Sequence, residues 1–174
     1  GYKTKKTNFS NPLRFELSRN QVIGLLSDIK NTPTSKRLMT SFWNYNDVQE
    51  KALQECAWST QWHVRDGYLD LMLIQRSVDI GLGWCFNVFQ YKALQILVAH
   101  CTGYKPGRFI HQMGCVQYYD RHEKDLLNLL QAPEYSEPKL ILNDKGLDFF
   151  SYNWEDFTVT DYNYGPFIPM EVAI

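Results

Sequence analysis

The sequence lacks the patterns that would place it in several large classes of protein. No apolar run approaches the roughly 20 residues that cross a bilayer, and the chain shows no signal peptide. The cysteines form no CxxC pair and no disulfide-framework spacing, and the histidines form no HxxxH or similar ligand set. We therefore expect a cytoplasmic protein with reduced thiols, no membrane contact and no bound metal.

The chain also has almost no excess of positive over negative charge, or the reverse. The net charge is -1, which argues against a nucleic-acid partner. The distribution is uneven, because the charged residues within 1–37 are mostly basic and those from residue 131 onward are mostly acidic. Two interpretations of the basic end stay open: solvated surface charge, or a surface that meets a small anion or an acidic partner.

What is present is typical of a packed domain. Of the 174 residues, 44% are hydrophobic and 15% are aromatic, which favours a packed hydrophobic core and a pocket lined by aromatic side chains. There is no internal repeat, low-complexity tract or linker, so we expect one domain over residues 1–174.

Residue patterns predict three helices. Asn20 caps the first, which ends at Thr32-Pro33; the second covers residues 86–101 and ends at Gly103; the third covers residues 120–131. Residues 1–18 and 44–54 read as loops, the latter with a possible helical turn. Strands are expected over residues 37–43, 56–64, 68–77, 109–119, 139–142 and 157–159.

Asp66-Gly67 is a strong hairpin signal between two of these strands. A two-residue loop with regular pairing sets Cys56 opposite Ser77 and points Arg76 to the other face. A three-residue loop, or one bulge, sets Cys56 opposite Arg76. In that second register the guanidinium favours the thiolate, which is the nucleophilic form of cysteine.

Each of these residues also has an ordinary structural interpretation. Cys56 suits a small buried apolar position, which is the commonest fate of a cysteine. Arg76 alone is typical of a surface or ion-paired residue, and Asn87 is suited to capping the long helix. Spacing alone leaves these alternatives open.

The run Cys56…Gln75-Arg76-Ser77-x-Asp79-x-x-Leu82-Gly83-x-x-Phe86-Asn87…Tyr91 resembles the thymidylate synthase family. Its Gln-Arg-Ser-x-Asp set at this distance after a cysteine is highly specific. The likeness covers nearly all of residues 20–174, including the segments 31–37, 41–44, 109–119, 138–140 and 172–174.

The resemblance implies an α+β fold, with a mixed, twisted β-sheet packed with helices and one sheet face forming a homodimer interface. It implies that a one-carbon unit is transferred from 5,10-methylenetetrahydrofolate to C5 of dUMP and reduced, giving dTMP and dihydrofolate. The Cys56 thiolate would add to C6 of the pyrimidine, which makes C5 nucleophilic. Folate is then both carbon donor and reductant, so no metal or nicotinamide is expected.

The resemblance also implies a role for each matched residue. The reactive centre would be formed by Cys56, Arg76 and Asp79. The residues that would bind dUMP are Lys36, Arg37, Gln75, Arg76, Ser77, Asn87, Gln117 and Tyr119. The residues that would bind folate are Asp79, Leu82, Gly83, Phe86 and Ala173.

The resemblance implies that different residues of this set contact different parts of the two substrates. Arg76 and Ser77 would bind the phosphate, with Lys36 and Arg37 reaching it from the partner subunit. Asn87 would read the O4 and N3 edge of uracil. Asp79 would bond the pterin, Tyr119 the sugar hydroxyl, and the tail that carries Ala173 would close over the folate.

Several departures from the family pattern are visible. The family's N-terminal third, with its phosphate-binding arginine loop, catalytic glutamate and folate-lining tryptophan, has no counterpart here, and we interpret the chain as a fragment. Cys115 and Gln117 replace the family's aspartate and histidine, Lys36 replaces an arginine, and Glu55 replaces a proline. A carboxylate beside Cys56 disfavours the thiolate.

Two alternatives to thymidylate synthesis therefore stay open. One is a family member that transfers a hydroxymethyl group to a pyrimidine nucleotide. The other is a catalytically weak nucleotide-binding homologue. Whether the 174-residue chain is active alone is a further open point.

Overall fold

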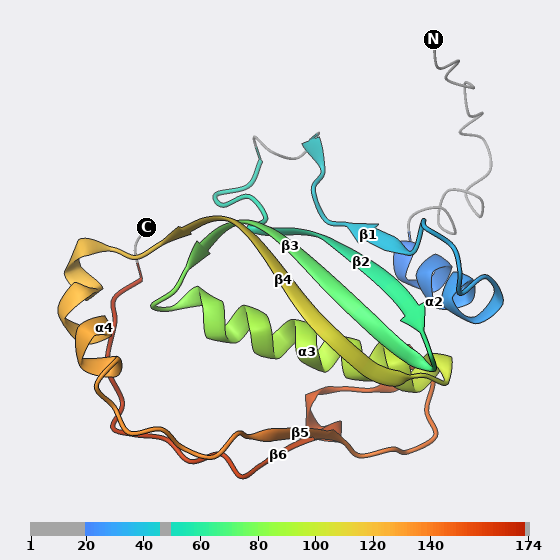
Figure 1. Cartoon of the computed structure of the whole chain (residues 1–174). Helices are drawn as coiled ribbons and strands as arrows, with labels where there is room; N and C mark the ends of the chain where they lie inside the picture. The colour runs from blue at the N-terminus through green and yellow to red at the C-terminus, as the bar shows by residue number, and fades with distance from the viewer. Residues whose placement is uncertain (1–19, 46–49, 173–174) are drawn as a thin grey trace.

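The computed structural model describes residues 20–45 and 50–172 (Figure 1). The loop expected over residues 1–18 and the folate contact expected of Ala173 lie outside these ranges. The elements that position the site are α2 (Gln21–Asn31), β1 (Met39–Ser41), β2 (Ala57–Arg65), β3 (Tyr68–Asp79), α3 (Gly83–Thr102), β4 (Lys105–Gln117), α4 (Glu123–Leu129), β5 (Lys139–Leu142) and β6 (Phe157–Thr160).

The main sheet has four strands in the order β1-β2-β3-β4. β1, β2 and β3 pair antiparallel, whereas β3 and β4 pair parallel because α3 carries the chain back between them. β5 and β6 form a separate two-stranded sheet. The α+β fold with a mixed, twisted sheet packed with helices is confirmed (Figure 1).

The predicted helices are present with shifted ends. Asn20 caps α2, and its side chain accepts a hydrogen bond from the Ile23 N–H. α3 begins at Gly83, three residues earlier than predicted, and Gly103 ends it with φ of 81°. The third helix opens with a 3-10 turn, Asp120–His122, before α4 continues to Leu129.

The predicted strands also hold, with the first one shorter than expected. β1 covers Met39–Ser41 rather than residues 37–43. Its flanks still bond to β2, because Leu38 accepts from Trp62 N and Phe42 donates to the Trp58 carbonyl, both at 2.8 Å.

The core lies between α3 and one face of the sheet. Leu69, Leu71 and Leu73 alternate along β3, and all three are fully buried. Val98 and Ala99 of α3 are buried in the same cluster. On the opposite sheet face, apolar side chains remain exposed, among them Met39, Ile110 and Val116.

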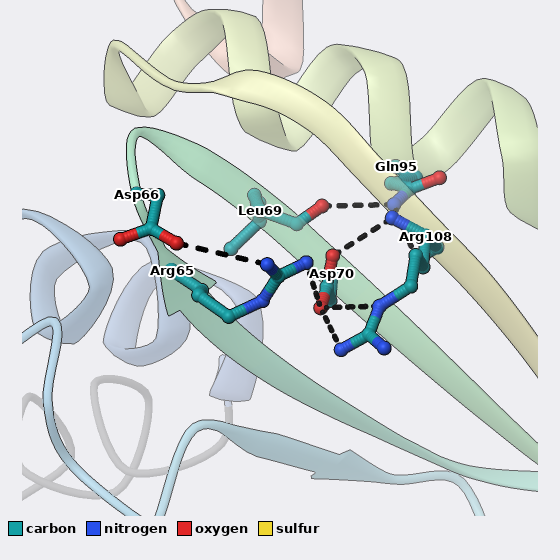
Figure 2. Close-up of polar contacts among 6 residues, drawn as sticks. All are labelled: Arg65, Asp66, Leu69, Asp70, Gln95 and Arg108. Carbon is teal, nitrogen blue, oxygen red and sulfur yellow. Dashed lines mark hydrogen bonds and ion pairs between the residues drawn. The ribbon is translucent and has the colours of Figure 1, made fainter.

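Near the hairpin turn, the pairing of β3 with β4 is irregular. Leu69 pairs with Pro106 but Leu71 pairs with Phe109, so β4 places two residues opposite Asp70. Asp70, which is 3% exposed, bonds this extra residue. Its carboxylate accepts hydrogen bonds from the Arg108 backbone N–H (2.7 Å) and guanidinium (2.9 and 3.1 Å). Figure 2 shows this cluster, with Arg65 on its other side.

Gln95 lies on α3, and its buried amide forms hydrogen bonds with the same irregular stretch of β3 and β4. Its Nε2 donates to the Leu69 carbonyl at 2.8 Å and to the Arg108 carbonyl at 2.9 Å (Figure 2). Gly107 leaves the necessary space, because a side chain there would collide with the Asp70 carboxylate. Asp70 and Gln95 thus pair backbone groups at the irregularity that would otherwise be buried without partners.

We predict that Asp70→Asn lowers the free energy of unfolding by about 2 kcal/mol, because the Arg108 guanidinium loses a charged acceptor. Burial opposes ionisation of Asp70, but the hydrogen bonds from Arg108 outweigh it and hold its pKa below the ordinary value of 3.8. The stabilisation is therefore complete above that pH and is lost as pH falls below it. Urea unfolding of wild type and variant at pH 7 and pH 3 measures both effects.

The matched control is Asp66→Asn, which changes an exposed carboxylate in the same hairpin. It should alter the unfolding free energy by no more than about 0.5 kcal/mol. Equal destabilisation by both variants would contradict the role given to Asp70.

Candidate functional site

The candidate site lies where β3 and β4 end and where β2 and α3 begin. Because β3 and β4 are parallel, their carboxyl ends share one edge of the sheet, a common position for ligand sites. Ser77 pairs with Cys115 there, and Asp79 pairs with Gln117. The start of β2 joins them, since Ala57 pairs with Gln75.

A bulge in β2 sets the register at Cys56. The turn is a two-residue loop, with φ of 52° at Asp66 and 80° at Gly67. Pairing is regular as far as Ser59 with Ile74, then shifts by one residue so that Ala57 pairs with Gln75. The structure thus has the bulged register, which sets Cys56 opposite Arg76.

Arg76 is held beside the Cys56 sulfur. Its backbone N–H donates to the Cys56 carbonyl at 2.8 Å, and its Nη2 lies 3.9 Å from Cys56 Sγ. The guanidinium also donates to the carbonyls of Gln54 and Glu55, each at 3.0 Å, and its Cζ lies 6.0 Å from the Trp43 ring centroid. These contacts give the cation a fixed position beside the thiol, so Arg76 is not an ordinary surface residue.

Glu55, which we expected to work against the thiolate, has a partner of its own. It forms an ion pair with Lys51, whose hydrogen bond is the main cause that holds the pKa of Glu55 below its usual value. The carboxylate charge beside Cys56 is thereby offset. Lys51 was not identified from the sequence, although its i, i+4 spacing from Glu55 is a usable signal.

Asn87 does not cap α3, because the N-cap residue is Leu82. It lies one turn into the helix, and its Oδ1 accepts a hydrogen bond from Gln75 Nε2 at 2.9 Å. Gln75 is 2% exposed and also bonds His111. His111 was not identified from the sequence, because it meets Gln75 only through the pairing of β4 with β3.

The turn after β3 carries the residues expected to bind folate. Asp79 Oδ1 accepts from the Gly81 N–H at 3.0 Å, and Leu82 and Gly83 are half-buried, whereas Phe86 is exposed. The C-terminal segment lies over this turn, because a Cβ at Gly81 would lie 3.1 Å from Met170 Sδ.

His122 holds that C-terminal segment. It is 2% exposed, and its Nε2 lies 3.0 Å from the Glu171 carbonyl oxygen. Its ring stacks edge-on against Tyr119, with centroids 5.7 Å apart. His122 was also missed from the sequence, since its contact with the tail spans 49 residues.

The end of β4 shows the substituted positions. Cys115 and Gln117 are exposed, with Cys115 Sγ 3.9 Å from Gln117 Oε1, and Tyr119 is half-buried. Gly114 permits the close approach of β4 to β3, because a Cβ there would lie 2.9 Å from the Arg76 carbonyl oxygen.

Lys36 and Arg37 do not join the site within one chain. Both are exposed and precede Met39, which pairs with Gln61, whereas Ser41 pairs with Ser59 nearer to Cys56. The direction of β1 therefore puts both basic residues toward the far end of the sheet.

Within residues 20–45 and 50–172, no group of three or more histidine, cysteine, aspartate or glutamate side chains is arranged to hold a metal ion. Across the same ranges, no helix has the length and apolar character to cross a membrane.

Comparisons with known proteins identify the family of this chain. A family model described as thymidylate synthase matches residues 2–174. The thymidylate synthases of Bacillus mojavensis and Bacillus phage phi3T are each 38% identical over 154 residues, which covers 88% of this chain and 55% of each relative. The chain thus spans about half the length of these curated relatives.

Comparison of the fold with solved structures points to the same family. The solved structure of thermostable thymidylate synthase A from Bacillus subtilis matches with a TM-score of 0.84 and 38% identity, over 88% of this chain and 55% of that one. Because a family model covers almost its whole length and a solved family structure shares its fold at 38% identity, the chain belongs to the thymidylate synthase family.

Proposed function

We propose that this chain is part of a thymidylate synthase that methylates dUMP at C5, with 5,10-methylenetetrahydrofolate as carbon donor and reductant. The observation that carries the proposal is the contact of Arg76 with the Cys56 sulfur at 3.9 Å, made possible by the bulge in β2. The guanidinium gives a thiolate nucleophile at this position a charged hydrogen-bond donor.

The reaction then begins at Cys56. Its sulfur forms a bond to C6 of the pyrimidine, and the displaced electron pair makes C5 nucleophilic. C5 bonds to the one-carbon unit and loses its proton. Cleavage of the carbon–nitrogen bond and transfer of a hydride from tetrahydrofolate complete the methyl group, and Cys56 leaves as dTMP and dihydrofolate form.

The other residues bind and orient the two substrates. Arg76 retains N–H groups beyond those given to Gln54 and Glu55, and these are directed to the nucleotide phosphate together with the Ser77 hydroxyl. Gln117 and Tyr119 face the sugar.

Folate binds at the turn after β3. Asp79 bonds the pterin, and Leu82, Gly83 and Phe86 line the site. The segment held by His122 supports a closing role for the tail that continues to Ala173.

The phosphate site is completed by a second subunit. Lys36 and Arg37 are exposed and directed away from Cys56 in their own chain, which suits a contribution to the partner's site. The sheet face with exposed Met39, Ile110 and Val116 supplies an apolar surface for that homodimer.

The intact protein should convert dUMP and 5,10-methylenetetrahydrofolate to dTMP and dihydrofolate. Absorbance follows dihydrofolate, and mass spectrometry identifies the nucleotide. A hydroxymethylated nucleotide without dihydrofolate would instead assign the hydroxymethylase reaction. Nucleotide binding without any product would assign the weak homologue, and both outcomes contradict the proposal.

Cys56→Ser should reduce turnover at least about a thousandfold, because a hydroxyl is a far weaker nucleophile than a thiolate at neutral pH. Nucleotide affinity should stay within about threefold of wild type, since binding rests on other side chains. Steady-state kinetics and calorimetric titration with dUMP measure the two quantities. Cys101→Ser, at the other end of α3, is the matched control and should retain activity; turnover by Cys56→Ser would overturn the assignment.

Asn87→Asp should move base preference from dUMP toward dCMP, because a carboxylate accepts from the cytosine amino group and repels the uracil O4. Gln75 Nε2 can still donate to the new carboxylate, so the fold should be kept. Competition between dUMP and dCMP in the binding assay measures the change. Asn128→Asp, on exposed α4, is the control, and an unchanged preference in Asn87→Asp would remove Asn87 from base recognition.

A further inference from the structure

Gln75 is a buried amide whose every polar atom has a partner. Its Nε2 donates to the Ser77 carbonyl and to Asn87 Oδ1, both at 2.9 Å. Its Oε1 lies 3.0 Å from Nε2 of His111 on the neighbouring strand β4. The side chain therefore links strand β4 to the first turns of helix α3.

The backbone determines which way the Gln75 amide points. The Ser77 carbonyl can only accept, so the nitrogen of Gln75 must face it, and the oxygen must face His111. The second N–H of Gln75 then fixes Asn87 as well, because only its oxygen can accept that bond.

His111 must in turn donate to Gln75. Burial lowers the pKa of His111 below its ordinary value of 6.5, so the ring is neutral near pH 7 and carries one N–H. Its Nδ1 is buried with no hydrogen-bond partner among the described residues. A proton on Nδ1 would leave a buried donor unpaired and turn two lone pairs toward each other at Nε2, so the proton belongs on Nε2.

We propose that His111 is a positioning residue which, through Gln75, fixes the Asn87 amide for uracil and against cytosine. This inference rests on the proposed function, in which Asn87 reads the base. With one lone pair of Oδ1 held by Gln75, the Asn87 amide is fixed so that its NH2 group donates to the O4 acceptor of uracil and the second Oδ1 lone pair accepts from N3–H. Cytosine presents an amino donor at that position and is rejected.

Removing the His111 donor changes this arrangement. Gln75 Oε1 would be buried without a partner, which favours rotation of the amide or entry of water. Asn87 is then free to turn its oxygen to the base and accept from a cytosine amino group. The selectivity of the site should fall, while the nucleophile and the phosphate residues are unchanged.

The test compares His111→Leu, which has no donor, with His111→Gln, which keeps an N–H on a side chain of similar length. Calorimetric titration with dUMP and with dCMP should show the preference for dUMP falling about tenfold in His111→Leu, the size of effect that one buried hydrogen bond supplies. His111→Gln should restore most of the preference. His100→Leu, on the far end of α3, is the control and should leave it unchanged.

Two NMR measurements on the ligand-free protein decide the positioning separately from nucleotide binding. Imidazole ¹⁵N shifts of the wild type should place the His111 proton on Nε2, and the Gln75 side-chain protons should exchange with solvent at least about tenfold faster in His111→Leu. A proton on Nδ1, unchanged exchange, or full dUMP preference in His111→Leu would each overturn the inference. Failure of wild type to bind either nucleotide would overturn the proposed function, while the NMR results would still decide the role of His111.

Discussion

One extra residue in β2 is the constraint on which the rest of the site depends. Regular pairing of β2 with β3 would continue from the Asp66-Gly67 turn and set Cys56 opposite Ser77. The bulge between Ala57 and Ser59 instead sets Cys56 opposite Arg76, with the sulfur 3.9 Å from the guanidinium. The same shift brings the carbonyls of residues 54 and 55 within reach of Arg76, so position and anchoring share one cause.

The sheet contains a second irregularity, in the pairing of β3 with β4, and different residues bond the backbone near each one. In β4 the extra residue near Arg108 is compensated inside the fold, by Asp70 from β3 and Gln95 from α3. Beside the bulge in β2, the exposed Arg76 guanidinium instead pairs the carbonyls of Gln54 and Glu55, which precede the strand. One bulge therefore stabilises the sheet, and the other shapes the candidate site at its edge.

The sequence predicted the elements well because their signals are local. Asp66-Gly67 marked the hairpin, Asn20 and Gly103 marked helix ends, and apolar spacing marked α3. The register at Cys56 could be reduced to two alternatives but not chosen, since Trp58 at the bulge is an ordinary strand residue without a glycine or proline signal. His111 and His122 were missed because their partners come from distant segments. The roles given to individual site residues rest on the family motif and remain predictions.

The structure shows the surroundings of three residues that depart from the family pattern: Glu55, Cys115 and Gln117. Glu55 is paired with Lys51, so its charge is offset, whereas Cys115 and Gln117 are exposed at the strand end and contact each other. The part of the site proposed to read the base is the most completely determined, because the Ser77 carbonyl fixes Gln75, and Gln75 fixes Asn87.

The central claim is that Cys56 adds to C6 of dUMP. Addition makes C5 basic, so the hydrogen at C5 should exchange with solvent even without folate. Incubating the protein with dUMP in D2O and following the C5 proton by NMR tests this directly. We expect loss of that signal with the wild type and its persistence with Cys56→Ser. Loss at the same rate with Cys56→Ser, or persistence with the wild type, would contradict addition by Cys56.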